Sequence, residues 1–495
     1  MNLSLEFSLQ LSILLPFVAT AGILAAGRMP NLREAVSIVT SLLLFYFVTT
    51  LYHGLEQGEV IAVQWWQLVP GLQLDFAIDS LGMLFALVAS FLWIVTTIYS
   101  IGYMRSHQER NQTRFYACFA IAIGSAMGIA FAANLFTLFI FYEVLTLSTY
   151  PLVTHAGTPE ARKGGRVYLG ILLGTSIAFF LLAIISTWFV AGTLDFKPGG
   201  VFGSDVNKLV ASTILVLFVF GIGKAAILPF HRWLPAAMVA PTPVSALLHA
   251  VAVVKAGVFT VLKVCVFVFG IDMLSILPST QFLLYLAGAS VLLASLVAMR
   301  QDNLKARLAY STVSQLGYVT MGALLATSAG VIGSSMHIAM HAFGKITLFF
   351  CAGAILVAAH KSNISEMRGL GKQMPITMAA FFIASLGIIG VPPAGGTWSK
   401  WFLLMGTLET EQWVLMAVLM ISSLLNIAYL IPIPFHAFFS GDSTPYSRAG
   451  IKEAPLASLI ALSITAVGCL VLFVYPQPLY ELARAILAAW GLTHG

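Results

Sequence analysis

The chain has 495 residues, of which 59% are hydrophobic and only 9% are charged. Soluble domains carry about a quarter charged residues, so this composition excludes a soluble globular protein and indicates a polytopic membrane protein. The net charge of +6 is spread over many loops, which argues against a nucleic-acid-binding patch. Four cysteines stand alone in apolar runs without cluster-ligand or haem-attachment spacing, so we expect no cofactor.

Apolar runs long enough to cross a bilayer follow one another along nearly the whole chain. We predict an all-α polytopic membrane protein with about fourteen transmembrane helices and no room for a soluble domain. The candidate spans are residues 8–27, 35–54, 79–103, 114–132, 134–154, 165–190, 209–230, 241–269, 281–300, 304–327, 329–359, 376–406, 412–440 and 455–475. Glycines and prolines within the seventh and twelfth spans predict that these two helices are broken.

Spans four to eight and nine to thirteen form two units of five helices, each with a broken helix in the fourth place. Because five is an odd number, the second unit would cross the membrane inverted relative to the first, and paired broken spans indicate a site in mid-membrane. We therefore expect an N-terminal three-helix segment (1–112), two inverted five-helix repeats (113–270 and 280–440) and a C-terminal helix with an amphipathic tail (450–495). The tail is expected to lie flat on the outer surface, because four apolar residues recur at helical spacing: Leu479, Leu482, Ile486 and Trp490.

With fourteen spans, most of the 25 lysines and arginines fall on one set of alternate loops. The opposite set holds only Lys197, Lys208 and Arg484. The positive-inside rule then places the basic loops on the cytoplasmic side and both termini outside. The stretch MNLSLEFSLQ lacks a basic n-region, so we expect it to lead into a retained first span.

The stretch GIGKAAILPFHRWLPAAMVAPTPVSALLHAVAVVKAGVF, from Gly221 to Phe259, combines strong hydrophobicity with two lysines, two histidines and four prolines. A lysine in hydrocarbon costs about 2.5 kcal/mol or more, so an intramembrane lysine indicates function. Lys224 lies just before Pro229, and Lys255 lies on the next helix. Prolines free backbone carbonyls that require side-chain or water partners. Two buried cations on adjacent, interrupted helices indicate a hydrated ion path.

The single intramembrane acid is Glu143. A buried carboxylate needs a compensating cation, and Lys224 is its natural partner. If the pair opens and closes, the lysine loses and gains a proton; the alternative is a static ion pair that holds helices together. Lys400 follows the second break, GIIGVPPAGGTWSKWF, and is a further intramembrane cation. Lys263 lies near the outer end of its span, where we expect it to extend toward the interface.

His337, His341 and Lys345 are spaced by four residues on the eleventh span and predict a polar stripe about 12 Å long. Imidazole titrates near neutral pH, so a proton wire is the favoured interpretation. Metal or haem binding would need a third ligand or a histidine on another helix, and we expect no metal. His249 could serve as a relay between the two lysines of the opening stretch, or could be a hydrogen-bonded interior histidine.

Four stretches resemble the antiporter-like subunits shared by Mrp cation/proton antiporters and respiratory complex I: KAAILPFHRWLPAAMVAPTPVSALLHAVAVVKAG, FYEVLTLSTYPLV, HAFGKITLFF and SLLNIAYLIPIPFHAFF. The likeness extends over about residues 70–440. It implies a Glu–Lys pair followed by a hydrated axis halfway across the membrane, formed by Glu143, Lys224, Lys255 and Lys400, with His249, His337, His341 and Lys345 as connecting groups. Lysine at position 400 favours the D-type subunits of the Mrp branch.

The sequence therefore predicts a proton-translocating subunit of a multi-subunit Na+/H+ antiporter in the plasma or inner membrane, which is not itself an enzyme. We expect other antiporter subunits, membrane lipid, protons and Na+ as its partners, and no nucleic acid. The second interpretation is a membrane subunit of a complex I-like NADH:quinone oxidoreductase or a membrane-bound hydrogenase. The third is a self-contained secondary transporter. Because no carboxylates cluster at sodium-binding spacing within the spans, the exchanged cation stays open.

Overall fold

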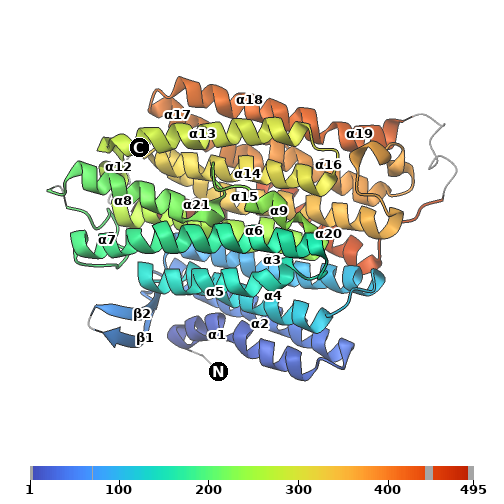
Figure 1. The fold of residues 1–495 in the computed structure, drawn as a ribbon, viewed down its shortest axis with the longest axis horizontal. Helices are drawn as coiled ribbons and strands as arrows, with labels where there is room; N and C mark the ends of the chain where they lie inside the picture. Colours follow the sequence, from blue (N-terminus) through green and yellow to red (C-terminus); the bar gives the residue numbers. More distant parts are fainter. Residues whose placement is uncertain (1–3, 70, 204, 441–449, 489–495) are drawn as a thin grey trace.

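The computed structural model describes residues 4–69, 71–203, 205–440 and 450–488. Most of its elements are helices that lie side by side along one common direction (Figure 1). Eleven helical segments of the described chain are long and apolar enough to cross a membrane. The protein is therefore a polytopic α-helical membrane protein, as its composition predicted.

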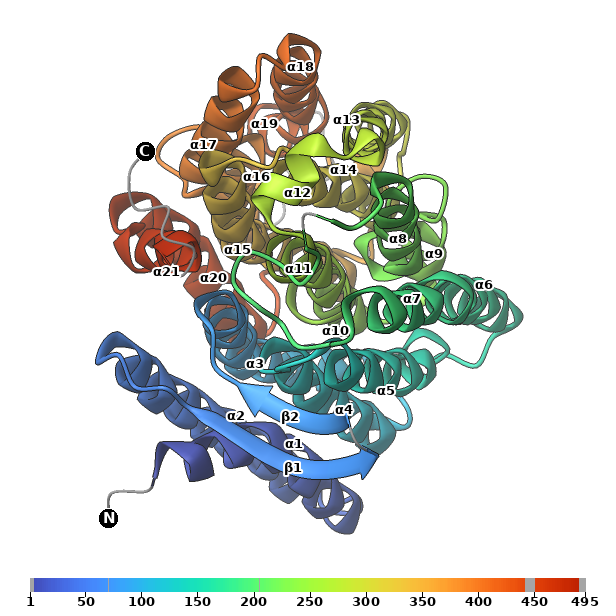
Figure 2. The same cartoon turned by 90° about the vertical axis from the view of Figure 1, so that its left-hand side faces the viewer.

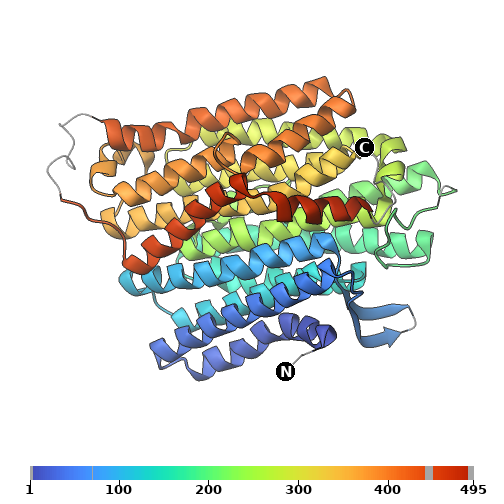
Figure 3. The same cartoon turned by 180° about the vertical axis from the view of Figure 1, so that it is seen from behind.

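A two-stranded sheet interrupts the N-terminal helices. The elements are α1 (Leu5–Ala25), α2 (Pro30–Glu56), β1 (Ala62–Val69), β2 (Leu72–Ala77) and α3 (Ser80–Ser106). The strands pair antiparallel, and the Trp65 and Phe76 rings lie 4.5 Å apart between their centroids. This short hairpin, between two long helices, was not among the predicted elements and leaves the helical membrane fold unchanged. We call this side of the molecule the hairpin end (Figure 3).

The next group of helices runs from α4 to α12. Its members are α4 (Gln112–Ala130), α5 (Leu135–Val153), α6 (Pro159–Thr175), α7 (Leu181–Ala191), α8 (Lys208–Gly221), α9 (Trp233–Ala236), α10 (Thr242–Ala246), α11 (Val253–Val264) and α12 (Ile271–Ile276). A π-helical turn joins α6 to α7, and another joins α10 to α11, so each pair forms one continuous segment.

The remaining helices include α15, which is buried along nearly all of its length and packs against α14, α16, α17 and α20. They are α13 (Pro278–Met299), α14 (Leu304–Leu324), α15 (Ser328–Ala359), α16 (Pro375–Ile389), α17 (Gly396–Glu409), α18 (Trp413–Leu430), α19 (Pro432–Phe439), α20 (Leu456–Val474) and α21 (Gln477–Ala488). Viewed from one end, α11 and α15 lie in the interior, with α1 and α2 at one margin and α18 at the other (Figure 2). The central helices therefore carry the polar groups farthest from lipid.

The C-terminal helix α21 packs against α3 and α15. Leu482 and Ile486 are buried in that contact, and α21 runs in the same direction as the spans (Figure 3). The expectation that this tail lies flat on the outer surface is therefore wrong for residues 477–488, because its apolar face has a helical surface to cover. Trp490, which the same expectation included, lies outside the described residues.

Two spans are interrupted, as the glycines and prolines predicted. After α8, a 3₁₀ turn of Gly223–Ala225 carries Lys224, and the Trp233 indole donates a hydrogen bond of 2.9 Å to the Gly223 carbonyl. After α16, Gly390 adopts φ +85°, in the left-handed region that glycine favours, and the helix resumes at Gly396. Both breaks place a lysine at a helix end inside the protein.

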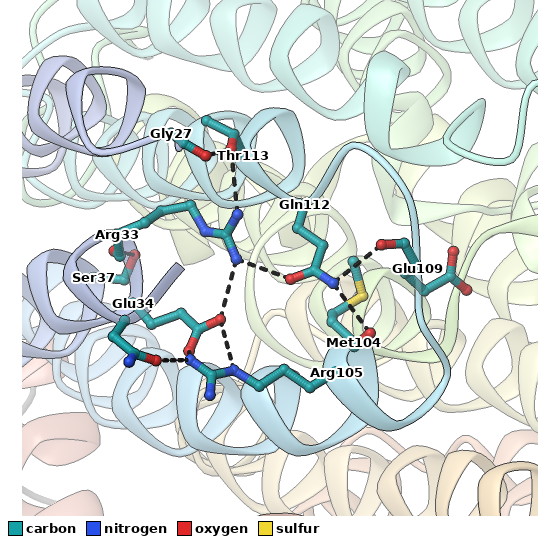
Figure 4. A network of polar contacts seen from close by, with 10 residues as sticks. Gly27, Arg33, Glu34, Ser37, Met104, Arg105, Glu109, Gln112 and Thr113 are labelled. Carbon is teal, nitrogen blue, oxygen red and sulfur yellow. Dashed lines mark hydrogen bonds and ion pairs between the residues drawn. The ribbon is translucent and has the colours of Figure 1, made fainter. Parts of the chain in front are cut away.

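A partly buried network of charged and polar side chains joins α2 to α3 and α4 at the end opposite the hairpin (Figure 4). We call this side of the molecule the basic end. Glu34 accepts hydrogen bonds from Arg33, at 3.1 Å, and from Arg105. Arg33 also donates to the Gln112 side chain at 2.8 Å. These contacts connect α2 to α3 and α4 and so link the N-terminal helices to the rest of the chain.

Candidate functional site

Five lysines are enclosed in the helical bundle within the described part of the chain. Four of them have no exposed surface and the fifth is 6% exposed: Lys224, Lys255, Lys263, Lys345 and Lys400. A buried ammonium is stable only with hydrogen-bond acceptors or a counter-charge nearby. The hydrogen-bond partners of each lysine therefore show how its ammonium group is stabilised inside the protein.

Lys255, on α11, contacts His341, one of two histidines that lie on the same face of α15. Its Nζ lies 2.5 Å from His341 Nδ1. The His341 and His337 rings are stacked, with 5.8 Å between centroids and 17° between planes. The spacing of four residues places both rings on one face of α15, as the sequence predicted. Lys255 is thus in contact with His341, which in turn is stacked on His337.

His337 connects this pair to the second broken helix. Its Nδ1 lies 2.9 Å from Ser399 Oγ, and its Nε2 lies 3.1 Å from Gln315 Oε1. The ring is also stacked on Tyr318, whose own ring lies 4.6 Å below Lys400 Nζ. The arrangement is a line of close contacts from Lys255 to Lys400 through polar and aromatic groups.

Lys400 lies at the end of this line, on α17. Its Nζ donates to the Ile389 carbonyl at 2.9 Å and to Ser423 Oγ at 3.0 Å. It lines a cavity of about 340 Å³ between the broken helix and α18, together with Tyr318 and Ser423. This cavity has room for several water molecules beside the ammonium group.

Lys345 lies one turn beyond His341 on α15 and points to α14. Its Nζ donates to the Leu308 carbonyl at 3.2 Å and to Ser311 Oγ at 2.6 Å. Ser311 in turn accepts a hydrogen bond of 2.9 Å from the Tyr429 hydroxyl. Lys345 therefore has its own acceptors beside the line and is not a link between His341 and Lys400.

Glu143 and Lys224 lie near one another but form no ion pair in the described structure. Lys224 Nζ donates instead to the Tyr142 carbonyl at 2.8 Å and to Thr146 Oγ1 at 2.6 Å, and it lies 3.1 Å from the Tyr142 ring centroid. Both carboxylate oxygens of Glu143 are enclosed without a hydrogen-bond partner among the described residues. The expected Glu–Lys pair is open in this structure.

The Lys224 turn packs directly on α11 at Gly257. A Cβ atom at Gly257 would lie 2.6 Å from the Lys224 carbonyl oxygen and would overlap the Lys224 and Ala225 backbone. Only glycine permits this approach. The turn that carries Lys224 is thereby held two residues from Lys255 on the neighbouring helix.

His249 stands apart from the line of contacts. It is fully buried in the π-helical turn before α11, with its ring 4.8 Å from that of Phe349. Neither ring nitrogen has a hydrogen-bond partner among the residues described. The structure thus places His249 beside α15 without joining it to the two lysines that it was expected to connect.

Lys263 differs from the expectation that it extends to the interface. Its side chain has no exposed surface, forms an ion pair of 2.8 Å with Asp79 and donates to the Ala132 carbonyl at 2.9 Å. Asp79 also caps α3 by accepting from the Gly82 amide at 2.8 Å. The expectation is wrong because α3 supplies a carboxylate at this depth. No described contact joins this pair to the line toward Lys400, so Lys263 is peripheral to it, as expected.

The structure therefore brings Lys255, His341, His337 and Lys400 into one line, places Lys345 beside it, and leaves Glu143, Lys224 and His249 near it without bonded links. The contacts from Tyr142, Thr146, Ser399 and Ser423 were not foreseen, and no sequence spacing reveals them. Among the residues that the structure describes, no three His, Cys, Asp or Glu side chains gather in a way that could hold a metal ion.

Electrostatics distinguish this interior from a packed core. No carboxylate forms an ion pair with Lys255, Lys345 or Lys400 in the described ranges. Their described hydrogen-bond partners are an imidazole, backbone carbonyls and hydroxyls. Buried ionisable groups held in this way inside a membrane protein are typical of ion or proton pathways.

The fold and the site define a polytopic membrane protein with buried ionisable groups, which in membranes mark ion or proton pathways. A family model described as "NADH:quinone oxidoreductase/Mrp antiporter, TM" matches residues 132–426, which is more than half of the chain. A second, described as "NADH-Ubiquinone oxidoreductase (complex I), chain 5 N-terminus", matches residues 65–116. The chain belongs to the NADH:quinone oxidoreductase/Mrp antiporter transmembrane family.

Its curated relatives come from both branches of the family. An NADH-quinone oxidoreductase subunit N from Desulforudis audaxviator is 31% identical over 97% of this chain and 98% of that protein. A D-type subunit of an Na(+)/H(+) antiporter from Alkalihalophilus pseudofirmus is 26% identical over 92% of each chain. This chain spans about half the length of another relative, an NAD(P)H-quinone oxidoreductase chain 5 from Synechocystis, with 31% identity over 66% of this chain and 49% of that protein.

Solved structures share the fold. A chain of the membrane-bound sulfane sulfur reductase, an archaeal respiratory membrane complex, superposes with a TM-score of 0.86 at 24% identity and covers 97% of each chain. A chain of the Mrp complex from Dietzia gives 0.86 at 21% identity, over 99% of this chain and 98% of that one. At these identities the likeness establishes the fold alone.

Proposed function

We propose that this chain is the proton-translocating membrane subunit of a multi-subunit monovalent cation/H+ antiporter, with Na+ as the exchanged cation. The observation that carries the proposal is the line of contacts Lys255–His341–His337–Lys400 through the protein interior. A series of bases at hydrogen-bond or stacking distance gives protons a route that hydrocarbon denies them.

In the proposed mechanism, Glu143 and Lys224 form the switch at the start of the line. When the pair closes, the carboxylate stabilises the charged lysine; when it opens, Lys224 loses that support and releases its proton more easily. Released charge passes through Lys255 and the two histidines toward Lys400. His249 and Lys345 act from the side, because both are buried within electrostatic range of the line.

The proposed architecture has fourteen spans. Eleven of these spans are the candidate spans described above. The other three are the two broken helices and α14, whose polar residues lower its mean hydropathy. Spans four to eight (113–270) and nine to thirteen (280–440) are two inverted repeats, preceded by a three-helix segment (1–112) and followed by 450–495. The basic end then faces the cytoplasm, with both termini outside.

The proposed setting is a complex of several subunits in the plasma or inner membrane. Relatives named as antiporter and oxidoreductase subunits, and a structural neighbour from an Mrp complex, support this setting. A second function stays open, because the relative that matches nearly the full length of both chains is named NADH-quinone oxidoreductase subunit N. In that case, electron transfer in partner subunits drives proton movement along the same line of residues.

The test uses the native complex, purified with its subunits identified and reconstituted in vesicles. Lys224→Ala or Glu143→Ala should abolish cation-dependent proton movement while the complex still assembles. Lys208→Ala, at the exposed start of α8, is the control and should retain transport. Native transport rates in assembled Lys224→Ala complex would overturn the proposal. Iron–sulfur or hydrogenase-like partners in the purified complex would replace the antiporter with the redox-driven alternative.

A further inference from the structure

Three of the five enclosed lysines share one hydrogen-bonding arrangement. Each ammonium donates to one backbone carbonyl and to one side-chain hydroxyl. The carbonyls belong to Tyr142, Leu308 and Ile389, and the hydroxyls, at 2.6, 2.6 and 3.0 Å from Nζ, belong to Thr146, Ser311 and Ser423. We call this arrangement the carbonyl–hydroxyl cradle.

The other two enclosed lysines are held differently. Lys263 has a carboxylate partner, Asp79, and Lys255 contacts the imidazole of His341. The cradle is therefore not what every buried lysine of this fold receives. It occurs at Lys224, Lys345 and Lys400, on three separate elements: the turn after α8, α15 and α17.

A cradle suits a lysine that changes its protonation state. A carbonyl oxygen only accepts hydrogen bonds, and it accepts an N–H from either the ammonium or the neutral amine. A hydroxyl accepts from the ammonium and, after rotation, donates to the lone pair of the neutral amine. A carboxylate would instead favour the charged form alone. The cradle therefore satisfies both forms of the lysine without moving its side chain.

We propose that Thr146, Ser311 and Ser423 are positioning residues of the proton path, each holding its lysine in place through both protonation states. The inference rests on the proposed function and deepens it, because it names the groups that keep the lysines in register between proton transfers. At Lys224 the cradle also defines the open state, since Thr146 and Tyr142 hold the ammonium away from the Glu143 carboxylate.

Other charged and titratable groups act on the same lysines. They are Glu143 and Tyr142 at Lys224; Lys255, Lys400, His341, His249 and Tyr429 at Lys345; and Lys345, Tyr318 and His337 at Lys400. Removing the Thr146 hydroxyl breaks no described side-chain hydrogen bond of these groups, whereas Ser311 also accepts from Tyr429 and Ser423 also contacts the Tyr318 hydroxyl. The effect of the Thr146 hydroxyl can thus be measured against a constant background.

The experiment compares transport by the reconstituted complex across pH for Thr146→Val, which keeps the shape and removes the hydroxyl, and for Thr146→Ser, which restores it. A charge-assisted hydrogen bond is roughly twice as strong as a neutral one, so removing the hydroxyl disfavours the ammonium more than the amine. The alkaline limb of the profile should therefore move toward acid by about one pH unit in Thr146→Val. Thr146→Ser should follow the native profile.

Thr320→Val is the matched control, because Thr320 is fully buried and its hydroxyl donates only to the Leu316 carbonyl of its own helix among the described contacts. Its profile should be native. If Thr146→Val fails to assemble, Ser423→Ala, a smaller change at the third cradle, gives the same readout and the same expected shift. A native profile in the assembled hydroxyl-free variants overturns the inference. Full transport by Lys224→Ala would overturn the proposed function itself, so the two failures are distinguishable.

Discussion

Replacing His341 with leucine removes the single ring that connects Lys255 to His337. Lys255 Nζ lies 2.5 Å from His341 Nδ1, and the two histidine rings are 5.8 Å apart between centroids. Without the imidazole, no hydrogen bond among the described contacts joins Lys255 Nζ to His337. Loss of a positioned proton carrier costs about 10²–10⁴-fold in rate, so we expect at least a ~100-fold fall in proton transport.

The assay is proton uptake by vesicles that contain the assembled complex, normalised to the amount of this chain. His155→Leu is the control, since it removes an equally buried imidazole at the basic end, away from the line. It should transport at the native rate at pH 7.5. A His341→Leu complex that assembles and transports within a few-fold of native would refute the reasoning, because protons would then bypass α15.

Three further outcomes follow from the packing and the charges. Gly257→Ala should push the Lys224 turn from α11, cost about 1–3 kcal/mol and lower transport, whereas Gly174→Ala, with open space around its Cβ, should be neutral in thermal unfolding. Asp79→Asn should lower the melting temperature of the complex, because Lys263 is left buried without its counter-charge; a native melting temperature would contradict this. Burial, aided by Arg114, lowers the pKa of His155, so the folded state binds fewer protons than the unfolded state below about pH 6.5. Melting temperature should therefore fall on acidification below that pH, and less so in His155→Leu; equal curves would exclude this role.

Most of the helical layout was predictable, because hydropathy and helix-breaking residues are local properties. The break before Lys400 was visible in the run from Gly390 to Gly396, and α16 and α17 end and begin there. The spacing of His337 and His341 was enough to place both rings on one face of α15. The hairpin was missed because it lies between two long apolar runs and is too short to register as a span.

The partners of the buried charges were not predictable, because they come from residues far apart in the chain. Thr146 meets Lys224 across 78 positions, and Lys263 meets Asp79 across 184. Nothing in the local sequence distinguishes these acceptors from other hydroxyls and acids. The position of Lys263 near the end of its helix likewise did not predict its burial, because the sequence does not show which neighbouring element covers that end.

The most direct test of the central idea compares two lysines on the same helix. Lys255 and Lys263 both lie on α11 and both lack exposed surface, but only Lys255 touches the histidine line. Proton transport per assembled complex should be lost in Lys255→Met and retained in Lys263→Met. Native transport by an assembled Lys255→Met complex would show that protons take another route.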